Sequence, residues 1–447
     1  MKYFGTDGFR GRVNETLTVD HAIKIGKFLG YYFSNTLGHV KCVIGKDTRK
    51  SGYMYEYGLV AGLTSTGVDV ALLHVTTTPS ISYITRTEKF DFGIMITASH
   101  NPYYDNGIKI IDRDGFKMGD KILQLVEDYI DGKIDIELAK NEKIGRAYDY
   151  IQGRNKYMSY LSQIPAQSFR GYKVGLDCAN GASFMIAKNV FDMLGADTYV
   201  INNEPDGLNI NKDCGSTHIE HLQELVKEKG LDIGFAFDGD ADRCLAVDEN
   251  GNIIDGDMLI YIYGCYLKEK DQLIKDTVVT TVMSNIGLTK ALQEKGIKNV
   301  QTAVGDKYVS AEIQAENYSV GGEQSGHVIF NKYATTGDGV LTAIKILEIC
   351  VEKKCSISSL VSDVTIFPQI LINVRVEKMD EVLERPELKE VTDAITAKLG
   401  DTGRILLRKS GTEPLVRIMV EAQTDEECEK YANEIKDKIL ELSESMN

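Results

Sequence analysis

Thr97-Ala98-Ser99-His100-Asn101-Pro102-Tyr103-Tyr104-Asp105-Asn106-Gly107-Ile108-Lys109, here called the serine loop, follows an apolar run from Phe92 to Ile96 that is typical of a buried strand. The ring of Pro102 disfavours the helical region for Asn101, so this pair predicts a turn. A strand that ends in such a turn holds the Ser99 hydroxyl at a fixed place at the end of a sheet. A hydroxyl held in this way suits a phosphate carrier or a nucleophile. A hydrogen bond within the turn is the alternative interpretation.

The strand before the serine loop is the third in a pattern that occurs three times along the chain. Strands alternate with helical segments in residues 41–109, 172–250 and 276–330, which predicts parallel α/β layers. The predicted strands are Val43–Gly45, Val68–Val75, Phe92–Thr97, Lys173–Cys178, Asp197–Asn202, Ile233–Phe237, Val278–Val282, Asn299–Ala303 and Tyr318–Gly321. Each third strand runs into a distinctive loop, and ligands bind at the carboxyl ends of such strands. We therefore expect three loops to converge on one cleft.

The C-terminal part of the chain has a different pattern. Strands are predicted over Val364–Val376 and Gly403–Gln423, around a helix from about Asp380 to Leu399. A last helix begins at Thr424, which forms a capping box with Glu427. Its apolar positions recur at helical spacing and indicate packing rather than a site: Cys428, Tyr431, Ile435, Ile439 and Leu442.

The predicted fold is three related α/β domains with mixed, mainly parallel sheets, followed by a C-terminal α+β domain, around a central active-site cleft. The expected domains are residues 1–150 with the serine loop, 151–255, 256–367 and 368–447. A chain of 447 residues is long enough for this number of domains.

Composition excludes several classes of partner. A net charge of −15 disfavours nucleic acids and anionic membranes, and it requires any phosphate site to be locally basic. The longest apolar runs, such as Met258–Tyr263, are too short to span a bilayer, and the N-terminus lacks the apolar core of a signal peptide. The eight cysteines are scattered without metal-binding spacing, which is typical of free thiols in a reducing cytoplasm.

The aspartate loop, Asp238-Gly239-Asp240-Ala241-Asp242-Arg243, places three carboxylates at alternate positions. Hard divalent cations such as magnesium take oxygen ligands of this kind. An EF-hand calcium loop is the rival interpretation, with Glu249 at its twelfth position. It fails at the sixth position, where Arg243 stands instead of glycine. A solvated acidic turn is the second alternative.

Two further loops combine glycine with polar side chains. In the glutamate loop, Gly321-Gly322-Glu323-Gln324-Ser325-Gly326-His327, Glu323 can accept hydrogen bonds from two adjacent hydroxyls of a ligand, and Ser325 can donate or accept. A plain glycine turn is the alternative. The arginine loop, Arg408 to Arg417, suits a phosphate, because hydroxyl and backbone N–H groups can cradle its oxygens beside an arginine clamp. The residues that carry this prediction are Arg408, Ser410, Gly411, Thr412 and Arg417.

Together with the opening segment Phe4-Gly5-Thr6-Asp7-Gly8-Phe9-Arg10-Gly11, these four loops resemble the motifs of the α-D-phosphohexomutases, the phosphoglucomutase/phosphomannomutase superfamily. The five motifs occur in the family's order from residue 4 to residue 417, which is far more specific than one motif alone. The opening segment and the glutamate loop resemble the branch that acts on glucosamine phosphates more than the branch that acts on glucose phosphates.

The resemblance implies a role for each residue. Phospho-Ser99 carries the phosphoryl group, and magnesium is bound by Asp238, Asp240, Asp242 and an oxygen of that phosphate. Lys109 and His100 are the acid–base candidates, with Lys109 near the reacting oxygen and His100 in support, and charge compensation alone is the alternative for Lys109. Arg10 and Arg243 hold phosphate or carboxylate oxygens, although an ordinary surface ion pair is the alternative for Arg10. Lys307, in Gly305-Asp306-Lys307, matches a further loop in which arginine is common.

The activity that the resemblance implies is an isomerase that converts glucosamine 6-phosphate to glucosamine 1-phosphate for UDP-N-acetylglucosamine, a cell-wall precursor. A hexosamine or glucose 1,6-bisphosphate would be the activator and intermediate, and a homodimer is compatible with the resemblance. The nearest alternative is a glucose- or mannose-phosphate mutase of the same fold. A non-catalytic sugar-phosphate-binding protein is the alternative from another class. The intact set of Ser99, Lys109 and three aspartates argues against it, because binding alone requires no phosphoserine–metal centre.

Overall fold

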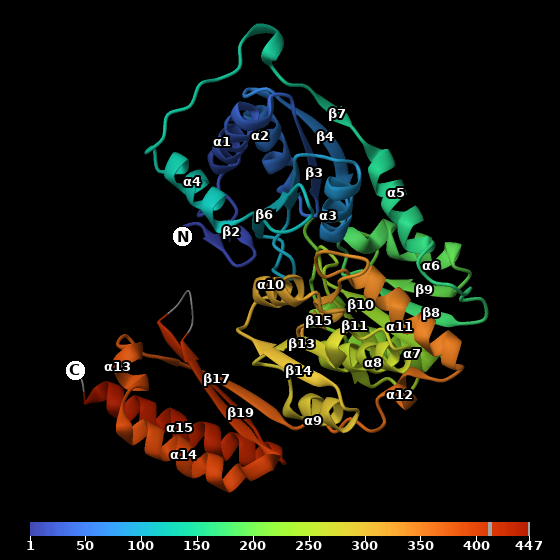
Figure 1. Ribbon diagram of the computed structural model, residues 1–447, viewed down its shortest axis with the longest axis vertical. Helices are drawn as coiled ribbons and strands as arrows, with labels where there is room; N and C mark the ends of the chain where they lie inside the picture. The colour runs from blue at the N-terminus through green and yellow to red at the C-terminus, as the bar shows by residue number, and fades with distance from the viewer. Residues whose placement is uncertain (410–413, 446–447) are drawn as a thin grey trace. The chain divides into compact units, whose positions relative to one another are not determined.

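The computed structural model describes residues 1–409 and 414–445 of the chain (Figure 1). The chain folds as two units, of which the first comprises Met1–Met283 and Ile297–Ser362. The second comprises Ser284–Gly296 and Asp363–Asn447. Within the described ranges, no helix has both the length and the apolarity needed to cross a membrane.

The first sheet carries the serine loop and has the strand order β1-β2-β6-β5-β3-β4-β7. Strand β3 pairs in parallel with β4 and β5, whereas β6 pairs antiparallel with β5 and β2. Its elements are β1 (Phe4–Gly5), β2 (Gly8–Arg12), α1 (Val19–Leu37), β3 (Val40–Lys46), α2 (Gly52–Thr64), β4 (Val68–Val75), α3 (Thr78–Thr87), β5 (Phe92–Ile96), β6 (Asp105–Asp112), α4 (Asp120–Ile130) and β7 (Ala147–Asp149).

Alternation along β3 explains why helices cover both faces of this sheet. Cys42 and Ile44 join the core formed with α1, α2 and α4, while Val43, between them, joins the core formed with α3. Successive side chains of a strand point to opposite faces, so a strand with apolar residues at every position needs a layer on each side. Figure 1 shows α1 and α2 on one side of the sheet and α3 on the other.

The second sheet carries the aspartate loop in the order β12-β11-β10-β8-β9, with β8 parallel to β9 and β10. Its elements are α5 (Ile151–Ser162), β8 (Lys173–Asp177), α6 (Ala187–Met193), β9 (Asp197–Ile201), α7 (Glu220–Lys229), β10 (Ile233–Phe237), β11 (Cys244–Val247) and β12 (Ile253–Ile254).

The third sheet carries the glutamate loop in the order β14-β13-β15-β16, with β13 parallel to β14 and β15. Its elements are α8 (Gly256–Glu269), β13 (Thr277–Thr281), β14 (Lys298–Thr302), α10 (Asp306–Glu316), β15 (Val320–Gly322), β16 (Val328–Phe330), α11 (Gly339–Lys353) and α12 (Ile357–Leu360).

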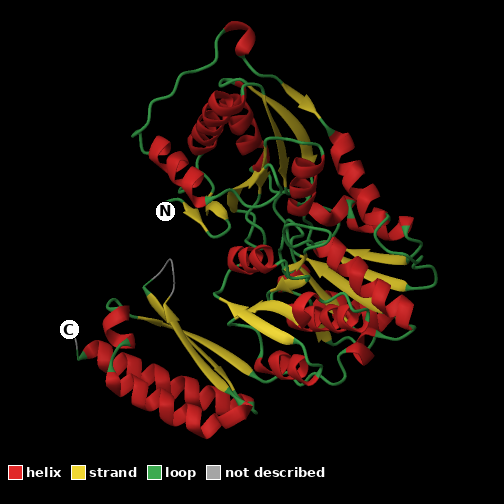
Figure 2. Cartoon of the chain, viewed as in Figure 1, coloured by secondary structure: helices red, strands yellow, loops and turns green. Residues whose placement is uncertain are grey.

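The second unit is an antiparallel sheet, β17-β19-β18, with helices on one face (Figure 2). Its elements are α9 (Ile286–Glu294), β17 (Gln369–Arg375), α13 (Met379–Leu383), α14 (Pro386–Leu399), β18 (Arg404–Lys409), β19 (Leu415–Glu421) and α15 (Asp425–Glu444). The Thr424 hydroxyl accepts from the backbone N–H of Glu427 at 3.2 Å, and the predicted apolar stripe of α15 is buried.

Three local predictions were wrong. The single helix from Asp380 to Leu399 is two helices, because Pro386 starts a new helix and disfavours helical geometry at the residue before it. The strand predicted from Val364 begins only at Gln369, after Pro368, which has no N–H to donate. The last five residues of the serine loop, Asp105 to Lys109, are not a loop but the start of strand β6.

The three-fold pattern of the sequence is present in the fold. Strands β5, β10 and β15 each pair in parallel with a neighbour, and they end directly before Thr97, Asp238 and Glu323. Chain reversal at their carboxyl ends therefore starts the serine, aspartate and glutamate loops. The sheets are mixed, as expected. The domain boundaries at 150, 255 and 367 remain predictions.

Candidate active site

Ser99 is almost fully buried and has a left-handed backbone, with φ of +51°. Its N–H donates to the Thr97 hydroxyl at 2.9 Å, and its own hydroxyl donates to Asp238 at 2.6 Å. A non-glycine residue at positive φ is strained, and such strain persists only where the surroundings enforce it. The turn therefore presents the Ser99 hydroxyl to the aspartate loop at an energetic cost that neighbouring groups must offset.

Arg49, which the sequence analysis missed, supplies much of that support. Its fully buried guanidinium donates to the carbonyl oxygens of Ser99 at 2.9 Å, Asn101 at 2.7 Å and Asp105 at 3.1 Å, and also to that of Pro102. The same guanidinium pairs with Asp47, which accepts from the Thr97 hydroxyl. Four of the five N–H donors of this rigid guanidinium thus fix the backbone of the serine loop.

The aspartate loop lies directly against the serine loop. A Cβ on Gly239 would stand 2.5 Å from the Ser99 carbonyl oxygen, so only glycine permits this approach. The amide of Asn211 donates to the carbonyl oxygens of Ser99 at 2.8 Å and Asn101 at 3.0 Å. The two loops are therefore held together by close backbone contact as well as by the hydrogen bond between Ser99 and Asp238.

Asp238, Asp240 and Asp242, here called the acid triad, are buried, and one carboxylate oxygen from each lies within 4.8 Å of the others. One oxygen of Asp240 and one of Asp242 are buried without a hydrogen-bond partner among the described residues. Oxygen donors that are close together and only partly satisfied fit a hard divalent cation. The triad is therefore suited to bind magnesium.

Lys109 compensates part of the triad's charge. Its ammonium lies 2.8 Å from Asp240, 3.1 Å from Asp242 and 3.1 Å from Asp7. Burial acts to lower the pKa of Lys109, but the three carboxylates outweigh it and raise that pKa well above its ordinary value. Burial and the charges of Asp242 and Asp240 raise the pKa of Asp238. In this geometry Lys109 is a charged donor.

His100 differs from Lys109 in its charge state. One ring nitrogen lies 3.5 Å from the Ser99 hydroxyl oxygen. Burial, together with the nearby Arg243 and Arg10, lowers the pKa of His100 to about 4. The ring is therefore neutral near pH 7 and able to accept a proton, which Lys109 in its charged form is not.

The predicted arginines lie around these loops. Arg10 pairs with Asp7, and the Arg243 guanidinium approaches Asp242 at 4.0 Å. The Nε atoms of both arginines are buried and without a hydrogen-bond partner within the part of the chain that the structure describes. Both side chains therefore keep hydrogen-bonding capacity for an anion.

The glutamate loop joins the same site through His327. This buried ring lies 3.7 Å from Asp242 of the triad and 3.5 Å from Asp306, and these carboxylates, opposing burial, raise the pKa of His327 to about 9. Glu323 accepts from the backbone N–H of Gly305 at 3.2 Å. The buried Ser325 hydroxyl has no hydrogen-bond partner among residues 1–409 and 414–445.

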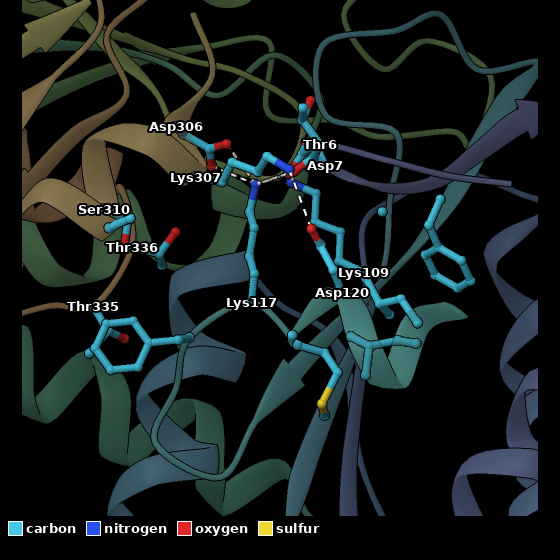
Figure 3. A pocket seen from close by; sticks show the side chains of 18 of the residues that line it. Thr6, Asp7, Lys109, Lys117, Asp120, Asp306, Lys307, Ser310, Thr335 and Thr336 are labelled. Carbon is cyan, nitrogen blue, oxygen red and sulfur yellow. Dashed lines mark hydrogen bonds and ion pairs between the residues drawn. The ribbon is translucent and has the colours of Figure 1, made fainter. Parts of the chain in front are cut away.

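A cavity of about 360 Å³ opens beside these residues (Figure 3). Lys307 lies at its wall, 3.8 Å from Asp120, and Lys117 lies between Asp7 and Asp306. The sequence analysis assigned no role to Asp7 as an individual residue and did not identify Lys117. The structure thus brings together Ser99, His100, Lys109, Arg10, the acid triad, Arg243, Glu323, Ser325 and Lys307 within the first unit.

The arginine loop belongs to the second unit. Arg408 on β18 and Arg417 on β19 are directly opposite in the antiparallel pair. Burial and the charge of Arg417 lower the pKa of Arg408. Both Nε atoms are buried without a hydrogen-bond partner in the described ranges, while Lys409 pairs with Asp380 at 2.5 Å. Ser410, Gly411 and Thr412 lie outside the described residues.

Comparison with known families covers nearly the whole chain. Residues 1–136, 150–251 and 255–367 match phosphoglucomutase/phosphomannomutase alpha/beta/alpha domains I, II and III, and residues 371–438 match the C-terminal domain of the same family. A curated phosphoglucosamine mutase of Lachnoclostridium phytofermentans is 58% identical over 435 residues, which are 97% of each chain.

Solved structures share the fold at low identity. A phosphoglucomutase/phosphomannomutase family protein of Burkholderia thailandensis has a TM-score of 0.80 at 23% identity, covering 98% of this chain and 96% of that one. The Aspergillus fumigatus N-acetylphosphoglucosamine mutase in complex with GlcNAc-6P and magnesium has a TM-score of 0.68 at 17% identity, covering 99% of this chain and 96% of that one.

Proposed function

The chain belongs to the phosphoglucosamine mutases of the phosphoglucomutase/phosphomannomutase superfamily, and from this premise we propose that it interconverts glucosamine 6-phosphate and glucosamine 1-phosphate. One observation supports the mechanism above all others. The hydroxyl of Ser99, on a strained and buttressed turn, is hydrogen-bonded to the buried acid triad. A serine in a merely structural turn needs neither the strain nor three carboxylates.

Phosphoryl transfer would run through Ser99 in both directions. Phospho-Ser99 gives its phosphoryl group to a hydroxyl of the bound sugar phosphate, so the Ser99 Oγ–P bond breaks as the sugar O–P bond forms. The resulting 1,6-bisphosphate turns over in the site, and its other phosphoryl group returns to Ser99. His100, neutral near pH 7, would exchange the proton of the reacting hydroxyl, and Lys109, charged in this geometry, would stabilise the transferring oxygens.

The donor set of the triad fits magnesium. Asp238, Asp240, Asp242 and an oxygen of phospho-Ser99 would hold the ion, as the resemblance implies. When bound, magnesium offsets the negative charge that three carboxylates and a phosphate bring together. Support comes from the two unpartnered carboxylate oxygens of the triad and from the magnesium in the Aspergillus fumigatus structure.

The remaining loops would bind the parts of the substrate that do not react. Arg408 and Arg417 are proposed to bind the phosphate that is not transferred, together with Ser410, Gly411 and Thr412. Arg10, Arg243 and Lys307 would contact phosphate oxygens near the reacting centre. Glu323 would accept hydrogen bonds from sugar hydroxyls, and Ser325 would donate or accept them. Both would do so in each of the two orientations of the sugar that the reaction requires. The proposed location is the cytoplasm, where the eight free thiols would remain reduced.

Side-by-side kinetics with glucosamine, glucose and mannose 6-phosphates test the substrate. Each reaction contains magnesium and is primed with the matching bisphosphate. We expect kcat/KM for glucosamine 6-phosphate to exceed that for glucose 6-phosphate by at least about tenfold, or ~1.4 kcal/mol of transition-state binding. Equal or better use of glucose or mannose 6-phosphate would assign the chain to that substrate instead. Absence of magnesium-dependent turnover on all three would leave only sugar-phosphate binding.

A further inference from the structure

Lys117 bridges two segments of the first unit that are far apart in sequence. Its ammonium lies 2.7 Å from Asp7 and 2.6 Å from Asp306, and it donates to the Thr6 carbonyl oxygen at 3.1 Å. Its backbone is fixed by a bridge to Ile111 of β6. Figure 3 shows the side chain reaching across the cavity to both carboxylates. One cation therefore serves two carboxylates from different loops.

A second ion pair, of opposite polarity, joins the Gly305–Lys307 turn to the segment that carries Lys117. Lys307, next to Asp306, lies 3.8 Å from Asp120, at the start of α4. In one pair, Lys117 provides the cation and Asp306 the anion. In the other, Lys307 provides the cation and Asp120 the anion. The shorter and more buried pair, Lys117 with Asp306, holds the start of helix α10 and the Gly305-Asp306-Lys307 turn against the segment before α4, and the more exposed pair of Lys307 with Asp120 adds to it.

The two carboxylates that share Lys117 also contact the reacting centre. Asp7 lies 3.1 Å from the Lys109 ammonium and pairs with Arg10. Asp306 lies 3.5 Å from His327, which in turn lies 3.7 Å from Asp242 of the triad. Lys117 is therefore at the junction between the groups around the phosphoryl group and the loop that carries Lys307.

We propose that Lys117 is a positioning residue, which holds Asp7 and Asp306 together and so aligns Lys109 and Lys307 for the same substrate. This inference rests on the mutase function proposed above. Without Lys117, the two carboxylates would face each other with no cation between them. Repulsion would then push the Gly305–Lys307 turn away, and Asp7 would neutralise Lys109 and Arg10 more strongly.

The test is a double-mutant cycle on the full chain, with glucosamine 6-phosphate, magnesium and a bisphosphate primer. Lys117→Met should lower kcat/KM by at least about tenfold, with both a lower kcat and a higher KM. Asp306→Asn should lower kcat/KM by less than Lys117→Met does, because Lys117 still compensates the charge of Asp7. The double variant should be more active than Lys117→Met, because the repulsion is removed with the second charge.

Lys345→Met is the matched control. Lys345 is buried, pairs with Glu348 on α11 and lies over the rings of Tyr263 and Tyr333, none of which belongs to a loop of the site. Its loss should lower the melting temperature without changing kcat/KM beyond about twofold. A double variant no better than Lys117→Met, or a Lys117→Met enzyme with wild-type kinetics, would overturn the positioning role.

Two further outcomes keep the test decisive. If Lys117→Met does not fold, Asp306→Asn alone decides: it should raise KM at least about threefold with an unchanged melting temperature, and an unchanged KM overturns the inference. Failure of the proposed function looks different, because the wild-type protein itself would then have no mutase turnover.

Discussion

The acid triad of the first unit and the Arg408–Arg417 pair of the second both gather like charges, but they are compensated differently. The triad has protein cations beside it, with Lys109 in direct contact and Arg243 and His327 within 4.0 Å of Asp242. Arg408 and Arg417 are directly opposite each other on two paired strands, and the Nε atom of each is buried without a hydrogen-bond partner within the described residues. Like charges directly opposite in a sheet are destabilising.

This difference distinguishes a centre suited to transfer a phosphoryl group from one suited to bind a phosphate that does not react. A triad partly neutralised by the protein can take up a cation and a phosphoserine without a large excess of either sign. Two opposed arginines with unsatisfied Nε donors are suited to take their counter-charge from a ligand, as the proposed phosphate site requires. The acid triad should therefore control the rate of phosphoryl transfer, and the arginine pair should control the affinity for the substrate.

Asp240→Asn should give the largest effect, because it removes one charge from the triad at nearly constant shape. We expect kcat to fall by about a thousandfold, equivalent to roughly 4 kcal/mol of transition-state stabilisation, with KM changed by less than about threefold. Magnesium titrations should also give a weaker apparent affinity. Steady-state kinetics over a range of magnesium concentrations check both numbers, and a variant altered only in KM would break the proposed division.

Much of this site could be predicted from the sequence, because its chemistry is carried by short contiguous motifs. Ser99, the triad and Glu323 each follow the third strand of a repeated pattern, so local sequence places them at the carboxyl ends of strands. Arg49 also follows the carboxyl end of a strand, because Asp47-Thr48-Arg49 comes directly after β3, the neighbour of β5 in the sheet. The residue was missed because its role depends on four hydrogen bonds to a loop about 50 positions away.

Other features depend on contacts that no local pattern encodes. Lys117 and Asp306 are 189 positions apart, and neither is in a motif that predicts the pairing. The charge of Lys109 depends likewise on Asp7 and the triad, which reach it only through the tertiary fold. The break in the helix at Pro386, in contrast, was readable, because proline disfavours helical geometry at the residue before it.

Arg417→Ala should give a smaller effect of the opposite kind. Loss of one charge-assisted contact costs about 1.5–3 kcal/mol, so KM should rise by about 10- to 100-fold while kcat stays within about threefold of wild type. Lys409→Ala is the matched control, because Lys409 is in the same hairpin but pairs with Asp380. A fall in kcat with unchanged KM for Arg417→Ala would mean that the arginine pair acts on the transferring group instead.

The state of Ser99 tests the central claim most directly. Incubation of the full chain with magnesium and glucose 1,6-bisphosphate, followed by intact-mass measurement and peptide mapping, should find one phosphoryl group, on Ser99. Ser99→Ala should take up none and lose nearly all turnover while melting as the wild-type protein does. A Ser99→Ala variant that keeps near-normal turnover, or a phosphoryl group that maps to another residue of the active enzyme, would contradict the account.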